Sequence, residues 1–262
     1  MARNASVTAM LAGLLLAWGG PAFLISPLAP GPLVGELAMW GLLALVVAIV
    51  VFWERQPLSS TGLRPLNWRS FAWGGALAAF TMWLLLPLLS WGLRSAGIAG
   101  FEAGMAKAML LPAWIRLMAT VTAGIVEDGL FLGYAFTRLE QWTGHVWMAG
   151  AISVLVSAGL HFTNWGIGPV LAFVVAETIS TAFFVWRRDL LANMIAHVIV
   201  DTIGLVIVPL FIGIRETGSG GIGAVSGGIF EMVVELVMLG LLVVGIWAVA
   251  RVFRRRRKRE VP

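Results

Sequence analysis

The chain has 262 residues, of which 60% are hydrophobic and only 12% are charged, and its formal net charge is +5. A soluble domain carries about 25% charged residues, so this composition excludes an ordinary soluble globular protein and indicates a protein of the lipid bilayer. The chain has no cysteine, which excludes disulfide bonds, thiolate metal ligands and a cysteine nucleophile.

Eight apolar segments are long enough to cross about 30 Å of hydrocarbon as a helix, which takes about 20 residues. We therefore predict an all-α fold, a polytopic bundle of about eight transmembrane helices that forms a single membrane domain over residues 1–250. The first segment lacks a clear cleavage site, so we expect a retained helix there and not a signal peptide. In chain order the segments are 7–29, 33–53, 70–92, 113–136, 146–165, 168–187, 189–213 and 229–250.

Basic residues are distributed unevenly between the two sets of loops. Eight spans with a cytoplasmic tail place 14 of the 18 Lys and Arg residues inside, seven of them in the tail 251–262. This asymmetry predicts that both termini are cytoplasmic, in a bacterial-type plasma membrane. A basic run directly after an apolar segment predicts an anchor to anionic lipid headgroups, so we expect membrane lipid and no nucleic acid as its partner.

Ionisable side chains interrupt the fourth to seventh segments. Each costs about 2.5–3.5 kcal/mol at mid-membrane, so we expect them to converge on one polar pocket and not to face lipid. Residues four apart share a helix face, whereas adjacent residues point about 100° apart, so only one acid of the adjacent pair is expected to face the pocket. The residues that carry this expectation are Glu127, Asp128, His161, Glu177, His197 and Asp201.

Depth in the membrane conflicts with this convergence. At 1.5 Å per residue, His197 lies about 12 Å from the inner end of its predicted helix, whereas His161 lies over about 20 Å from the inner end of its own. The two histidines meet only if the fifth helix begins well inside the cytoplasm or if the helices tilt strongly.

Three short motifs stand in order along the same segments. The run Glu127-Asp128-Gly-Leu-Phe-Leu resembles EExxxR, His161 matches the histidine of FxxxH, and the run His197-Val-Ile-Val-Asp201 resembles HxxxN or HxxxD. Over residues 113–205 the chain thereby resembles the CPBP family (CAAX prenyl protease and bacteriocin-processing), in particular its type II CAAX prenyl endopeptidases. Two positions depart from the family pattern: Leu132 replaces the arginine of the first motif, and Ser157 stands where the phenylalanine of the second is expected.

The resemblance implies a glutamate-dependent, metal-independent intramembrane endopeptidase that cleaves a membrane-associated peptide or protein. Carried over to this sequence, Glu127 would activate a water molecule, His161 would help to position it, and His197 with residue 201 would support the developing oxyanion. An ionised Asp201 cannot donate to an oxyanion, so it is either protonated or orients His197, and we favour orientation. Asp128 would support the site.

Other interpretations remain open. A zinc ion could be held by Glu127, His161, His197 and Asp201, although the resemblance implies no cofactor. Because the resemblance implies that the motif arginine holds the acidic pair, Leu132 favours a non-catalytic membrane scaffold or an immunity-type relative. A proton-coupled transporter could use the acids, but no internal repeat supports it. The sequence assigns no role to Glu177.

Overall fold

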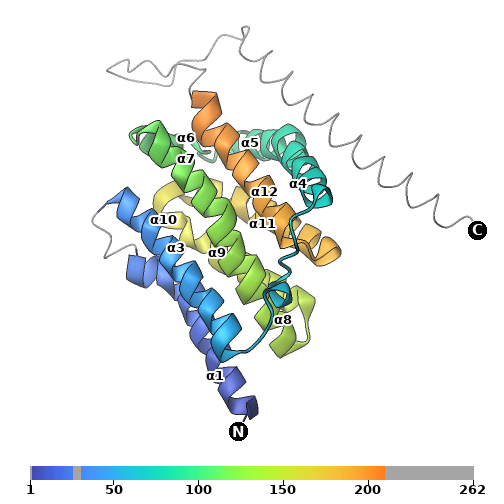
Figure 1. The fold of residues 1–262 in the computed structure, drawn as a ribbon. Helices are drawn as coiled ribbons and strands as arrows, with labels where there is room; N and C mark the ends of the chain where they lie inside the picture. Colours follow the sequence, from blue (N-terminus) through green and yellow to red (C-terminus); the bar gives the residue numbers. More distant parts are fainter. Residues whose placement is uncertain (1, 26–30, 210–262) are drawn as a thin grey trace, which may run out of the picture.

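The computed structural model describes residues 2–25 and 31–209, shown in colour in Figure 1. Within these ranges every regular element is a helix, as the composition predicts. The predicted eighth span, 229–250, the end of the seventh and the basic tail, 251–262, lie outside the described residues.

The first part of the described chain builds three long helices, each of which changes its winding along its length. A π-helical segment follows the α-helical one in the first two, and one interrupts the third. These helices and the short elements beside them are α1 (Ala2–Leu14) with η1 (Leu15–Ile25), α3 (Pro32–Ala48) with η2 (Ile49–Trp53), the 3₁₀ turn η3 (Leu58–Thr61), α4 (Trp68–Phe80) with η4 (Thr81–Leu85) and α5 (Leu86–Ser95), and α6 (Glu102–Met109).

The second part carries the three motifs. One continuous helix over residues 113–143, which we call the acid-bearing helix, bears the Glu-Asp pair. It consists of α7 (Ala113–Thr122), η5 (Ala123–Glu127), Asp128, η6 (Gly129–Phe136) and α8 (Thr137–Thr143). The elements that follow are α9 (Val146–Leu160), α10 (Phe162–Trp165), α11 (Ile167–Arg187), α12 (Leu190–Thr202) and η7 (Ile203–Ile207).

Local sequence explains where several helices begin and end. The Asn67 side chain accepts two backbone N–H groups at the start of α4, and the Asp189 side chain accepts one at the start of α12. Both satisfy N–H groups that have no partner inside the helix. Gly166 has a φ of 82°, a left-handed conformation that favours glycine, and it lets the chain reverse from α10 into α11.

The acid-bearing helix lies in the middle of the bundle, between α3 on one side and α12 on the other (Figure 1). Its central segment is the core of the structure, because every residue from Asp128 to Leu139 is buried. The outer helices instead expose large apolar side chains, among them Leu15, Phe52 and Trp147. A soluble protein rarely exposes so much apolar surface, whereas contact with lipid explains it.

Four described helices are long and apolar enough to cross a membrane: Pro32–Trp53, Trp68–Ser95, Ile167–Arg187 and Leu190–Ile207. Two shorter apolar helices cover Val7–Ala22 and Val146–Leu160. These helices agree with six of the predicted segments in position, although the fifth is shorter than predicted. We expected it to reach residue 165, but α9 ends at Leu160, because the chain turns through α10 and Gly166. Several helices of this kind make the chain an integral, multi-pass membrane protein.

Candidate functional site

The Glu-Asp pair lies where the two π-helical segments of the acid-bearing helix meet. Glu127 is the last residue of η5, and Asp128 precedes η6. One turn earlier, Gly124 lies directly against α12, since a Cβ atom there would lie 2.4 Å from the Val198 Cγ2 atom. Small residues allow membrane helices to approach closely, and here the approach brings the acidic pair beside the histidine of α12.

Each acid faces a different histidine. The Glu127 Oε2 atom lies 3.7 Å from His161 Nε2, at the end of α9, and the Asp128 Oδ1 atom lies 3.1 Å from His197 Nδ1, on α12. The expectation that only one acid of the pair faces the site is therefore wrong. Their separation of about 100° around the helix directs them toward two different helices, both of which carry site residues.

His197 lies between two carboxylates. Its Nδ1 atom faces Asp128, and its Nε2 atom lies 3.5 Å from Asp201 Oδ2, one turn further along α12. A neutral imidazole has only one N–H group, so only the protonated ring can donate to both acids at once. The arrangement thus favours a positively charged His197.

His161 is held differently. Its Nδ1 atom lies 2.9 Å from the Ser157 carbonyl oxygen, which can only accept a hydrogen bond, so Nδ1 carries a proton. In a neutral ring the Nε2 atom that faces Glu127 then presents a lone pair. The ring of Phe173, on α11, lies against His161 with 5.0 Å between the ring centroids.

Two further glutamates lie near this site. Glu177, whose role the sequence left open, accepts a hydrogen bond of 2.8 Å from the Ser157 hydroxyl and is within electrostatic range of His161, Glu127 and His197. Glu36, on α3, lies beside Thr122 and within electrostatic range of Glu127. Sequence reasoning missed Glu36, although a lone acid in an apolar segment was the signal that identified the others.

The conflict in depth is resolved by where the helices begin. α12 begins nearer the middle of the bundle than α8 does (Figure 1), and its capping residue Asp189 is buried, with 2% of its surface exposed. Few residues are therefore needed between the start of α12 and His197 to bring His197 beside Asp128. α9 and the acid-bearing helix run side by side and antiparallel, and His161 and Glu127 both lie far from the end at which these two helices connect.

The structure does not assemble the alternative zinc set. In the part of the chain that the structure describes, no three His, Asp or Glu side chains are grouped as a metal ion requires. The four residues instead divide between the Glu127–His161 contact and the contacts that surround His197.

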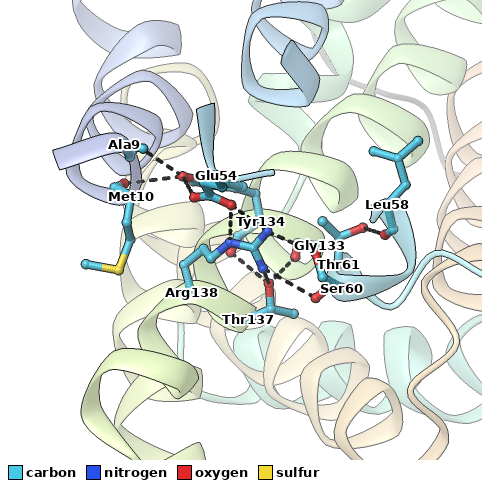
Figure 2. Close-up of polar contacts among 10 residues, drawn as sticks. All are labelled: Ala9, Met10, Glu54, Leu58, Ser60, Thr61, Gly133, Tyr134, Thr137 and Arg138. Carbon is cyan, nitrogen blue, oxygen red and sulfur yellow. Dashed lines mark hydrogen bonds and ion pairs between the residues drawn. The ribbon is translucent and has the colours of Figure 1, made fainter. Parts of the chain in front are cut away.

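Leu132, which occupies the position of the motif arginine, is buried in the hydrophobic core with 7% of its surface exposed. The buried arginine of the acid-bearing helix is Arg138, and Figure 2 shows its contacts. Its guanidinium lies 2.7 Å from Glu54 and also donates to Ser60, while the Tyr134 hydroxyl donates to Glu54 over 2.8 Å. We call Glu54, Ser60, Tyr134 and Arg138 the Glu54–Arg138 network. Its arginine is paired with Glu54 and not with the acidic pair.

Comparison with known protein families agrees with the three motifs. Residues 109–203 match a family described as type II CAAX prenyl endopeptidase Rce1-like. No curated protein and no solved structure matches the chain. The matched residues begin just before α7 and end with the first residue of η7. They include Glu127, Asp128, His161, Glu177, His197 and Asp201.

Proposed function

We propose that the chain is an intramembrane endopeptidase in which Glu127 activates a water molecule, from the premise that residues 109–203 match the type II CAAX prenyl endopeptidase Rce1-like family. The family implies an intramembrane endopeptidase.

The contact between Glu127 and His161 carries the proposal. With Nδ1 bound to Ser157, His161 Nε2 and the Glu127 carboxylate present two hydrogen-bond acceptors 3.7 Å apart. A water molecule beside them can donate one hydrogen to each, which directs its oxygen lone pair toward a substrate carbonyl. Glu127 accepts the proton as the water oxygen bonds to the carbonyl carbon, and it returns that proton to the departing amine when the C–N bond breaks.

His197 supplies the positive charge for the tetrahedral intermediate. The protonated ring, held by Asp128 and Asp201, can turn one N–H group from its carboxylate to the developing oxyanion. Asp201 acts here by orienting His197, because a carboxylate itself would repel the oxyanion.

The substrate is a membrane-associated peptide or the end of a membrane-associated protein. The family description names a CAAX end, in which a cysteine that carries a prenyl chain precedes two aliphatic residues and a final residue. Many described helices expose apolar side chains to lipid, and a prenyl chain partitions into the same hydrocarbon. A prenylated CAAX peptide is therefore the first substrate to test.

We also propose that both termini are cytoplasmic. The supporting observation is the distribution of Lys and Arg over the loops. Because the chain has no cysteine, R55C and R94C variants report the two sides of the membrane without background labelling. A membrane-impermeant maleimide added to intact cells should label R94C only, and labelling of R55C alone would reverse the orientation.

The test of the mechanism uses the full-length chain in lipid nanodiscs with a quenched fluorescent peptide that ends in a farnesylated CAAX sequence. We expect Glu127→Gln to lower kcat by about 10²–10⁴-fold, with His161→Ala and His197→Ala close to it. Glu140→Gln is the matched control, since Glu140 is a glutamate of the same helix, in its α8 segment, and pairs with Arg188 at the end of α11. Wild-type activity in all three site variants would overturn the proposal.

A non-catalytic relative is the second candidate, and buried Leu132 favours it. An apolar side chain in the core cannot hold the acidic pair as the motif arginine would. This candidate predicts that the wild-type chain cleaves no farnesylated, geranylgeranylated or unprenylated CAAX peptide, and that Glu127→Gln leaves the phenotype of cells producing the protein unchanged. Cleavage that depends on Glu127 excludes it.

A further inference from the structure

Glu177 is a carboxylate on an apolar helix for which the proposed mechanism has no use. A charged side chain is costly in an apolar membrane helix, so the presence of Glu177 requires an explanation. Its hydrogen-bond partner is the Ser157 hydroxyl, on α9. Ser157 is also the residue that replaces the phenylalanine of the FxxxH motif, so this bond joins an unexplained acid to a departure from the family pattern.

Ser157 binds the catalytic histidine at the same time. The last turn of α9 is tightened, because the backbone N–H of His161 donates to the backbone carbonyl of Ala158 over 3.2 Å and not to that of Ser157. The Ser157 carbonyl is thereby left for the imidazole, whose Nδ1 atom donates to it over 2.9 Å. The carbonyl of Ser157 thus binds His161, and its hydroxyl binds Glu177 of α11.

α11 contacts this turn at two positions four residues apart. Phe173 lies against the imidazole ring and Glu177 accepts from Ser157, so both side chains project from the same face of α11 toward α9. His161 itself lies where α9 ends and α10 begins, so its imidazole is held by the end of α9 and by Phe173 of α11. The direction of Nε2 therefore depends on α11 as well as on α9.

From these contacts we propose that Glu177 is a positioning residue, which through Ser157 holds the last turn of α9 against α11 and so fixes His161 Nε2 against Glu127. This inference rests on the proposed endopeptidase function. A misplacement of about 1 Å in a reacting group can lower a rate by 10²-fold, so a hydrogen bond that acts on His161 indirectly can still affect turnover.

The test measures kcat and KM separately for the full-length chain in nanodiscs, with the farnesylated CAAX peptide as substrate. We expect Ser157→Ala and Glu177→Ala each to lower kcat by about 10- to 100-fold with little change in KM. The double variant should be no slower than the slower single variant, because both substitutions break one shared bond. Glu177→Gln and Ser157→Thr keep an acceptor and a hydroxyl, and both should restore most of the turnover.

Ser153→Ala is the matched control. Ser153 lies one turn before Ser157 on α9, is equally buried, and its hydroxyl has no hydrogen-bond partner to lose, so its kcat should equal that of the wild type. The inference is overturned if Glu127→Gln abolishes cleavage while Ser157→Ala and Glu177→Ala leave kcat unchanged. It is also overturned if the effects of the two substitutions multiply, or if Glu177→Gln is as slow as Glu177→Ala. Undiminished cleavage by Glu127→Gln would instead overturn the proposed function itself.

Discussion

The acid-bearing helix contributes to two polar clusters, and the acids of the two clusters have different partners. In the Glu54–Arg138 network an arginine is paired with a glutamate, and hydroxyl groups bind both (Figure 2). At the site, Glu127, Asp128 and Asp201 face histidines and Glu177 faces a serine. An arginine is always charged, whereas the charge of a histidine depends on its surroundings and on pH.

The two clusters also differ in how much of their side chains is exposed. The ion-paired side chains of the network are only 3% and 4% exposed, whereas His161 and Glu127 are 25% and 23% exposed. The network therefore joins the N-terminal helices to the acid-bearing helix with its charges neutralised and sealed. The site instead keeps acids and imidazoles that are partly exposed and whose charge depends on pH, so the less well compensated charges are also the more accessible ones.

The largest effect is expected when the network loses its cation. Arg138→Met leaves the Glu54 carboxylate buried beside Tyr134 with no opposite charge, which should lower the free energy of unfolding by about 3–5 kcal/mol. The measurement is unfolding of the detergent-solubilised chain in increasing SDS, followed by tryptophan fluorescence.

The double variant Glu54→Gln with Arg138→Met tests the reason for that loss. Glutamine is neutral and still accepts from Tyr134, so the double variant should recover most of the lost stability. If it is no more stable than Arg138→Met alone, an unpaired charge is not what destabilises the single variant.

At the site, removal of a charge should have the opposite consequence. Asp128→Asn weakens the shorter of the two contacts to His197. We expect kcat for the farnesylated CAAX peptide to fall by about 10- to 100-fold, because the loss of a charge-assisted hydrogen bond changes a rate by about this factor. Stability should be unchanged or higher, because one poorly compensated carboxylate is gone. A large loss of stability would place Asp128 with the structural charges of the network.

Asp201→Asn is the comparison within the same site. Its contact with His197 is longer, at 3.5 Å, and asparagine is the residue of the HxxxN form of the motif. An amide oxygen can still orient the ring, so we expect kcat to stay within about threefold of the wild type. A larger loss than that of Asp128→Asn would mean that the charge at position 201 participates directly.

These contrasts also explain how much the sequence could predict. Apolar runs and ionisable residues predict the helical class and the residues that gather at the site, because lipid penalises each exception strongly. The sequence could not show that Glu127 and Asp128 serve different histidines, since that depends on which helices lie on either side. It also gave no reason to pair Arg138 with Glu54, which is 84 residues away, because that pairing depends on tertiary packing.

Gly124→Ala tests whether the close packing of the acid-bearing helix against α12 is needed for stability and for the geometry of the site. The added methyl group would lie 2.4 Å from the Val198 side chain and 2.7 Å from its backbone nitrogen, so the two helices must separate. We expect a loss of about 1–3 kcal/mol in stability together with slower cleavage, because Asp128 moves away from His197. Gly75→Ala, on α4, is the control, since nothing lies within 4 Å of its added methyl group. Alanine favours a helix over glycine, so helix propensity alone would stabilise both variants. Equal losses in the two variants would therefore show that the contact with α12 is not the cause of the loss.

The smallest effect on stability is expected at the ion pair of Arg188 with Glu140. This pair tests whether burial explains the large effect expected at the ion pair of Arg138 with Glu54. Both oxygens of Glu140 accept from Arg188, yet the two side chains are 40% and 24% exposed, so water screens their attraction. Glu140→Gln should therefore lower the free energy of unfolding by only about 0–1 kcal/mol. The hydrogen bonds from Arg188 to Glu140 raise the pKa of Arg188 above its ordinary value. A raised pKa contributes stability at every pH below the unfolded value and loses it only at still higher pH, so through Arg188 the difference between wild type and variant should stay constant across the neutral range. A loss as large as that of Arg138→Met would mean that burial is not what makes the Glu54–Arg138 pair indispensable.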